Sequence, residues 1–143
     1  MELEVRQRRA VQLARRNAIA ALHATIVREK LDVGPASCPV RHHFAEGSYG
    51  REMTLPAGLI VVGKIHKPSH VNVISKGHVK VFTEHGGVEE LQAPCTFVST
   101  PGTQRVVLVL EETVWTTVHV TDKTDLAEIE REVIAQNFEE IEL

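Results

Sequence analysis

Hydrophobic residues recur with a helical period near the N-terminus of this chain. Four of them are spaced four positions apart: Ala14, Ala18, Leu22 and Ile26. This spacing places them on one face of an α-helix, and the segment Asp32-Val33-Gly34-Pro35 ends the pattern because proline cannot continue a helix. The pattern predicts an amphipathic helix within residues 1–33. Its alanine-rich face could pack on the rest of the chain or on a second subunit.

Residues 38–120 have a different pattern, in which short runs rich in β-branched residues alternate with turn residues. The runs predict eight strands: 52–55, 59–66, 70–75, 79–83, 88–91, 96–99, 105–110 and 113–120. Short strands with such regular punctuation are typical of an antiparallel sandwich or barrel. The pair Gly86-Gly87 predicts a type I′ hairpin, because that turn needs two residues with positive φ.

A helical period returns after Thr121. Asp122 or Thr124 is suited to cap the helix. Its predicted buried stripe is formed by Leu126, Ile129, Val133 and Ile134. We therefore expect a C-terminal helix within residues 121–143, and a mainly β chain with one helix before the barrel and one after it.

Composition excludes several classes of protein. The chain has 143 residues, of which 43% are hydrophobic and 24% charged, as in one ordinary globular domain. A net charge of −3 gives no reason to expect a nucleic-acid partner, and no apolar run is long enough for a membrane span. Two cysteines, Cys38 and Cys95, are too few for a disulfide scaffold. We expect a soluble protein with both thiols reduced.

One spacing within the strand region points to a particular barrel. Gly58 is followed by five residues and Lys64-x-His66, then by three residues and His70, and then by six residues and Gly77. Residues 64 and 66 share a face of a strand because side chains alternate. The spacing resembles the first motif of the cupins, small β-barrels in which these positions hold Gly, His-x-His, Glu and Gly. The resemblance implies a cupin-like double-stranded β-helix, a jelly-roll barrel.

The second cupin motif is matched more weakly, through the turn Pro101-Gly102 and through Arg105, which takes the place of its histidine. The resemblance therefore assigns the four metal-ligand positions to Lys64, His66, His70 and Arg105. Lysine must lose a proton to bind a metal and arginine does not do so in practice, which leaves two imidazoles. His119 is the best additional ligand, since it is in phase with Trp115 and Thr117 on the last strand. The candidate metal ligands, for a divalent transition metal, are His66, His70 and His119.

Charge gives an alternative. Two permanent cations beside histidines would make the mouth of the barrel electropositive, which suits a carboxylate, phosphate or nucleotide. The candidate ligand-binding residues are then Lys64, His66, His70, Arg105 and His119. If Lys64 and Arg105 instead reach solvent or pair with carboxylates, the barrel is filled and holds no ligand.

A second resemblance concerns origin. Residues 63–67 and 73–77, together with 93–99 and 113–119, look similar to small single-domain cupin-like proteins of tailed phages and prophages. The similarity covers residues 38–130. It implies a phage or prophage origin, and hence a place in the cytoplasm of the bacterial host or in a virion.

The sequence is compatible with three functions. The favoured one is a module that binds a small anion or a metal without chemistry, because the inward polar set lacks an evident acid–base pair. The others are a virion structural or assembly protein, which would contact other phage structural proteins, and a metal-dependent isomerase or dioxygenase. We also expect a homodimer or a higher homo-oligomer, because an open sheet edge needs cover.

Overall fold

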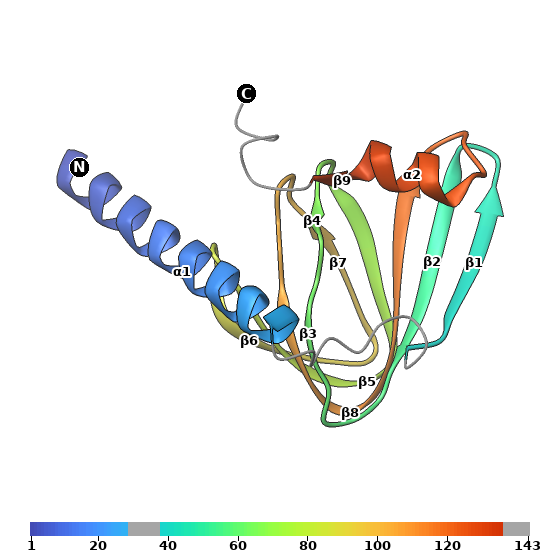
Figure 1. Cartoon of the computed structure of the whole chain (residues 1–143), viewed down its shortest axis with the longest axis horizontal. Helices are drawn as coiled ribbons and strands as arrows, with labels where there is room; N and C mark the ends of the chain where they lie inside the picture. Colours follow the sequence, from blue (N-terminus) through green and yellow to red (C-terminus); the bar gives the residue numbers. More distant parts are fainter. Residues whose placement is uncertain (29–37, 136–143) are drawn as a thin grey trace.

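The computed structural model of the chain describes residues 1–28 and 38–135. The chain is mainly β, with one helix before the sheet and one after it, as the sequence predicts (Figure 1). Its elements in chain order are α1 (Glu2–Arg28), β1 (Val40–Ala45), β2 (Ser48–Leu55), β3 (Ile60–Val62), β4 (Ile65–His66), β5 (His70–Thr83), β6 (Gly87–Gln92), β7 (Cys95–Ser99), β8 (Val106–Val120), α2 (Leu126–Val133) and β9 (Ile134–Ala135).

The strands form a curled antiparallel sheet in the order β1-β2-β8-β5-β6, in which β3 also pairs with β8 and β7 with β5. A two-residue ladder between β4 and β9 lies beside it. The long strands β5 and β8 each pair with several partners, and they run through both halves of the barrel (Figure 1). Residues that face inward along them alternate with outward ones, so the barrel interior can be predicted from strand phase.

The strand β5 is continuous over residues 76–78, where the sequence predicts a break between the strands 70–75 and 79–83, so that prediction is wrong. Gly77 lies inside β5 with φ 103°, and the pairing with β8 changes register on both sides of it. A Cβ atom at Gly77 would lie 2.5 Å from the carbonyl oxygen of Glu112. The glycine is therefore a bulge at which the strand bends across the barrel. The predicted break between residues 110 and 113 is likewise absent, because both segments belong to β8.

The hairpin at Gly86-Gly87 is confirmed, but its type is not. Thr83 pairs with Gly87, so that residues 84–86 form a three-residue loop, and only Gly87 of the glycine pair has a positive φ, at 67°. A type I′ turn would need two such residues.

One end of the barrel is closed by α2 (Figure 1). The N-cap of the helix is Asp125, whose side chain accepts a hydrogen bond from the backbone N–H of Glu128 at 3.0 Å, and neither predicted cap holds this position. The helix ends earlier than predicted because Ile134–Ala135 turns into β9 and pairs with Ile65 and His66 of β4. The predicted remainder, residues 136–143, lies outside the described residues.

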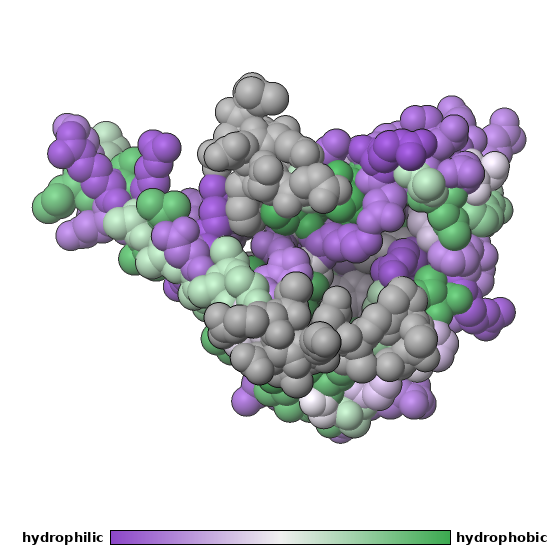
Figure 2. Space-filling model, in the orientation of Figure 1, coloured by the Kyte–Doolittle hydropathy of each residue, from purple (hydrophilic) through white to green (hydrophobic). Residues whose placement is uncertain are grey.

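The N-terminal helix α1 projects from the barrel, and hydrophobic and hydrophilic side chains are mixed along it (Figures 1 and 2). Its buried residue is Ile19, which is 1% exposed, while the predicted stripe residues Ala14, Ala18 and Leu22 face solvent. The side chain of Ile26 lies outside the described residues. Of the two predicted roles for this stripe, packing on the barrel is wrong for these three residues. No helix in the described ranges is both long and apolar enough to cross a membrane.

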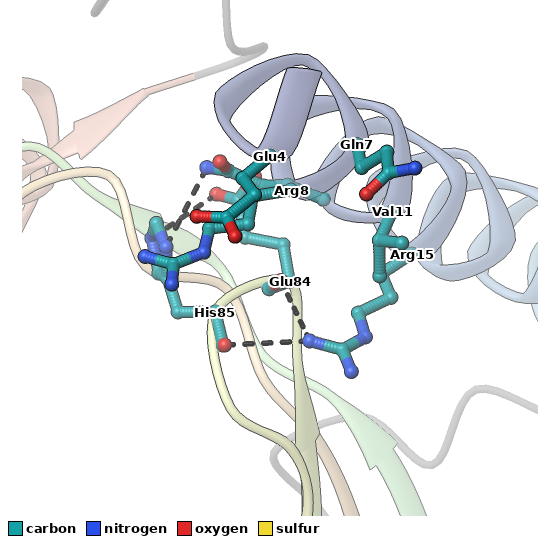
Figure 3. Close-up of a pocket in the computed structure, with 8 residues that line it drawn as sticks. Glu4, Gln7, Arg8, Val11, Arg15, Glu84 and His85 are labelled. Carbon is teal, nitrogen blue, oxygen red and sulfur yellow. Dashed lines mark hydrogen bonds and ion pairs between the residues drawn. The ribbon is translucent and has the colours of Figure 1, made fainter. Parts of the chain in front are cut away.

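A polar anchor attaches α1 to the β5–β6 hairpin. Glu84 is buried, and its carboxylate accepts hydrogen bonds from Arg16 Nε at 2.8 Å and from Gln12 Nε2 at 3.2 Å. Arg15 reaches the carbonyl oxygens of Glu84 and His85 (Figure 3). These contacts hold the helix at its middle.

The exposed stripe makes the predicted homodimer testable. We expect the chain to elute with twice its monomer mass in light scattering, and the double variant Ala14→Glu/Ala18→Glu to be monomeric. Carboxylates placed in a closely packed helix interface would be desolvated without partners. The control is Ala20→Glu, at an exposed position on another face of α1, which should stay dimeric. A monomeric mass for the unchanged chain would contradict the prediction.

Candidate functional site

Three histidines from three strands point into one end of the barrel. His66 belongs to β4, His70 begins β5, and His119 lies near the end of β8. On β5, His70 has the same inward orientation as the buried Asn72, because side chains two residues apart share a face of a strand. On β8, His119 likewise shares a face with the buried Trp115. Strand pairing therefore brings together imidazoles that are up to 53 residues apart in the chain (119 − 66).

The histidines form a compact cluster. One ring nitrogen from each of His66, His70 and His119 lies within 4.8 Å of the other two, and the ring centroids are 4.3 to 5.1 Å apart. His70 and His119 are buried and His66 is half-buried. Among the residues that the structure describes, no other His, Cys, Asp or Glu joins this group. The structure thus brings together all three predicted metal ligands.

The surrounding backbone fixes His66, although β4 is only two residues long. The carbonyl oxygen of His66 accepts a hydrogen bond from Gly102 N at 2.8 Å, and the neighbouring Lys67 N–H donates to the carbonyl of Val133 at 2.7 Å. Both α2 and the Pro101-Gly102 turn therefore hold this imidazole against the other two.

Two nitrogens of the cluster lack a hydrogen-bond partner among the described residues. The Nδ1 atoms of His66 and His119 are buried and unpaired, whereas Nδ1 of His70 lies 3.4 Å from the carbonyl oxygen of Pro68. In the tautomer that donates to Pro68, His70 keeps its Nε2 lone pair for a ligand. A buried polar atom without a partner costs about 1–3 kcal/mol. A bound group that pairs with these nitrogens would remove that cost.

All three imidazoles are held neutral. Burial, followed by the charges of His70, His119, Arg51 and Arg105, lowers the pKa of His66 to about 3. Burial is also the main reason that the pKa of His119 falls to about 4 and that the pKa of His70 is lowered. A neutral imidazole has the lone pair that a metal ion needs.

Arg105 lies beside this cluster, as the second cupin motif predicts. Its Nη1 donates a hydrogen bond to Ser99 Oγ at 2.7 Å, and its guanidinium carbon lies 5.1 Å from the centroid of the Phe97 ring. Ser99 pairs in register with His70. Burial lowers the pKa of Arg105, which the carboxylate of Glu89 partly offsets.

Arg51 is a site residue that the sequence did not assign. It pairs with Thr117 on β8, two residues from His119, and its charge lowers the pKa of both His66 and His119. Strand phase was the available signal, because Arg51 is in the same phase on β2 as the buried residues Tyr49 and Leu55. Strand phase alone does not place Arg51 near His119, because this also requires the pairing of β2 with β8.

Lys64 does not join the cluster, and its predicted place there is corrected. Its side chain is 61% exposed and forms an ion pair with Glu130 of α2. The predicted strand over residues 59–66 is interrupted at Gly63 and Lys64, between β3 and β4, and Gly63 N donates to the carbonyl of Arg105. Because the strand does not run through residue 64, the rule that residues 64 and 66 share a face fails here.

Comparisons with known proteins support the fold. No family model and no curated protein matches the sequence. Solved structures do match. Ectoine synthase from P. lautus has a TM-score of 0.57 at 10% identity, over 71% of this chain and 75% of that one. KdgF from Halomonas sp. has a TM-score of 0.53 at 15% identity, over 66% and 87% of the two chains. An RmlC-like cupin with a double-stranded β-helix from Methanocaldococcus jannaschii has a TM-score of 0.51 at 11% identity, over 64% and 86%.

At these identities the likeness shows the fold and nothing finer. The phage or prophage origin stays a prediction. The chain has the cupin fold, a double-stranded β-helix with a helix at each end.

Proposed function

We propose that this protein is a cupin-fold binding protein that holds a divalent transition metal on His66, His70 and His119, with a small anion beside it. One observation carries the proposal, namely that three neutral imidazoles present ring nitrogens within 4.8 Å of one another. Imidazole is the common protein ligand for zinc, copper, iron and nickel. The cluster supplies the same number of ligands as a three-histidine zinc site.

The geometry fits a metal after a small contraction. Tetrahedral ligands at about 2.0–2.1 Å from a zinc ion lie about 3.4 Å from one another, while the ring nitrogens here lie within 4.8 Å. A metal bound through the unpaired Nδ1 atoms of His66 and His119 would give these buried polar atoms a partner, which would favour such a contraction. A bound ion would supply a Lewis acid with open coordination positions.

The nearby arginines favour an anion as the companion of the metal. Arg51 and Arg105 have no ion pair within 4.0 Å among the described residues, and both influence His66. A divalent ion would add two positive charges to this group, so an anionic ligand is needed to balance it. The sequence predicts a metal or an anion as alternative ligands. The proposed site holds both.

A metal-dependent cupin enzyme is the second candidate, because a three-histidine centre leaves positions open for a substrate. A binding role is favoured over it because, among the described residues, no carboxylate joins the histidine cluster to act as an acid or base. Ectoine synthase and KdgF, named by the structural comparison, are reasonable guides to substrates for a first activity screen.

Metal binding gives the primary test. We expect protein purified without a His tag to bind about one Zn²⁺ or Co²⁺ per chain in isothermal titration, and His119→Ala to weaken binding by more than roughly 100-fold, because even outer-shell partners are worth 10–100-fold. The control is His78→Ala, a half-buried histidine of β5 that pairs with Glu90 outside the cluster. Circular dichroism shows whether each variant is folded. Equal affinity in the two variants would contradict the proposal.

The lowered pKa values predict acid sensitivity of the metal-free protein. Below pH 6.5 the unfolded chain takes up a proton at His66 that the folded chain resists down to about pH 3, so stability is lost as the pH falls through this window. Protonation of His66 in the unfolded chain should by itself lower the free energy of unfolding by about 2 kcal/mol when the pH falls from 7.5 to 5.

Urea unfolding in the presence of a chelator measures this difference. In His66→Gln the loss between the two pH values should be smaller than in the unchanged chain by about the same 2 kcal/mol, while His78→Gln should behave like the unchanged chain. An identical loss in all three proteins would show that His66 is not held neutral.

A further inference from the structure

A cavity of about 400 Å³ lies between β5, β6, β7 and the loop that precedes β8. Much of its wall is apolar, formed by Val81, Leu91 and Phe97, and Arg105 contributes a permanent charge to the lining. This volume is within the range of small-molecule sites, which are mostly apolar with a few placed polar groups. The cavity therefore has the composition of a binding site for a molecule with one charged end.

The guanidinium of Arg105 is fixed in place but retains free donors. Within residues 1–28 and 38–135, one of its five N–H groups has a protein acceptor, Ser99 Oγ at 2.7 Å, and the Phe97 ring packs against the guanidinium. No described carboxylate lies within ion-pair distance of it. A planar guanidinium with free donors matches the two oxygens of a carboxylate.

A buried hydrogen-bond chain holds Ser99 in position. Ser99 is 1% exposed, and its Oγ also accepts a bond from Asn72 Nδ2 at 2.7 Å. Asn72 Oδ1 in turn accepts from Trp115 Nε1 at 3.0 Å. Asn72 lies two residues from His70 on β5, and Ser99 pairs with His70 across β5 and β7. This chain therefore connects the cavity to the histidine cluster and preorganises Arg105 between them.

The composition of the lining distinguishes among anions. Glu89 also lines the cavity, and a carboxylate there repels a dianion such as phosphate more than it repels a monoanion. The apolar walls gain from contact with hydrocarbon and not with a phosphate or a sugar. We propose that Arg105 binds the carboxylate of a small monocarboxylic acid, whose hydrocarbon part packs against Val81, Leu91 and Phe97. This deepens the proposed function, on which it rests for the role of the acid as the companion anion of the metal.

Hexanoate is a suitable probe, with acetate, hexanol and inorganic phosphate for comparison. We expect saturable 1:1 binding of hexanoate to the metal-loaded full chain in isothermal titration, weaker binding of acetate, and none of hexanol or phosphate. Arg105→Gln should weaken hexanoate binding by about 10- to 100-fold, since a hydrogen bond to a charged group contributes about 1.5–3 kcal/mol. Arg41→Gln, which removes an exposed arginine outside the cavity, should have no effect.

A second variant keeps the test valid if Arg105→Gln does not fold. Leu91→Ala shortens the apolar wall, so it should weaken hexanoate binding while leaving acetate binding unchanged. Unchanged hexanoate affinity in Arg105→Gln, or tighter binding of phosphate than of hexanoate, would overturn the inference. Metal binding without hexanoate binding would refute this inference alone, whereas hexanoate binding by a chain that takes up no metal would refute the metal site alone.

Discussion

Three imidazole rings share the closed end of this barrel, and their desolvation is the constraint on which the site depends. Burial makes the charged form of each ring costly, so the pKa values of His66 and His119 fall to about 3 and 4. The rings are thereby kept in the form that binds a metal, and two of them keep buried nitrogens without partners. The surrounding elements maintain this state: α2 and β9 close the end of the barrel over β4, and Gly77 lets β5 bend so that His70 and the distant half of the same strand both line the interior.

The same barrel separates two kinds of polar group. The histidines are neutral and face one another, while Arg51 and Arg105 keep their charge nearby and have no ion pair among the described residues. The buried Trp115–Asn72–Ser99 chain extends from the core to Arg105. This arrangement places a candidate cation site next to a candidate carboxylate site, and each would reduce the electrostatic cost of filling the other.

Most of the fold could be predicted from the sequence, because strand runs and turn residues are local signals. The errors arose where tertiary pairing overrides them. Gly77 resembles a turn but is a bulge in a continuous strand, and β1 was missed because its residues do not alternate clearly and are mostly exposed. The C-terminal helix was extended too far because Ile134 continues its apolar stripe, although the backbone there pairs with β4. The end of the helix could not be predicted locally, because it depends on the position of β4, which is distant in the sequence.

The three histidines at the centre of the site could be predicted from the sequence. His66 and His70 followed from motif spacing, and His119 from its phase with Trp115 and Thr117 on the last strand. Lys64 was misplaced because the strand breaks at Gly63, and Arg51 was not assigned because its proximity depends on the pairing of β2 with β8. X-ray absorption on the zinc-loaded protein is the most direct test of the three-histidine metal site. We expect three imidazole nitrogens at about 2.0–2.1 Å from the metal. A first shell of oxygen atoms without imidazole scattering would contradict it.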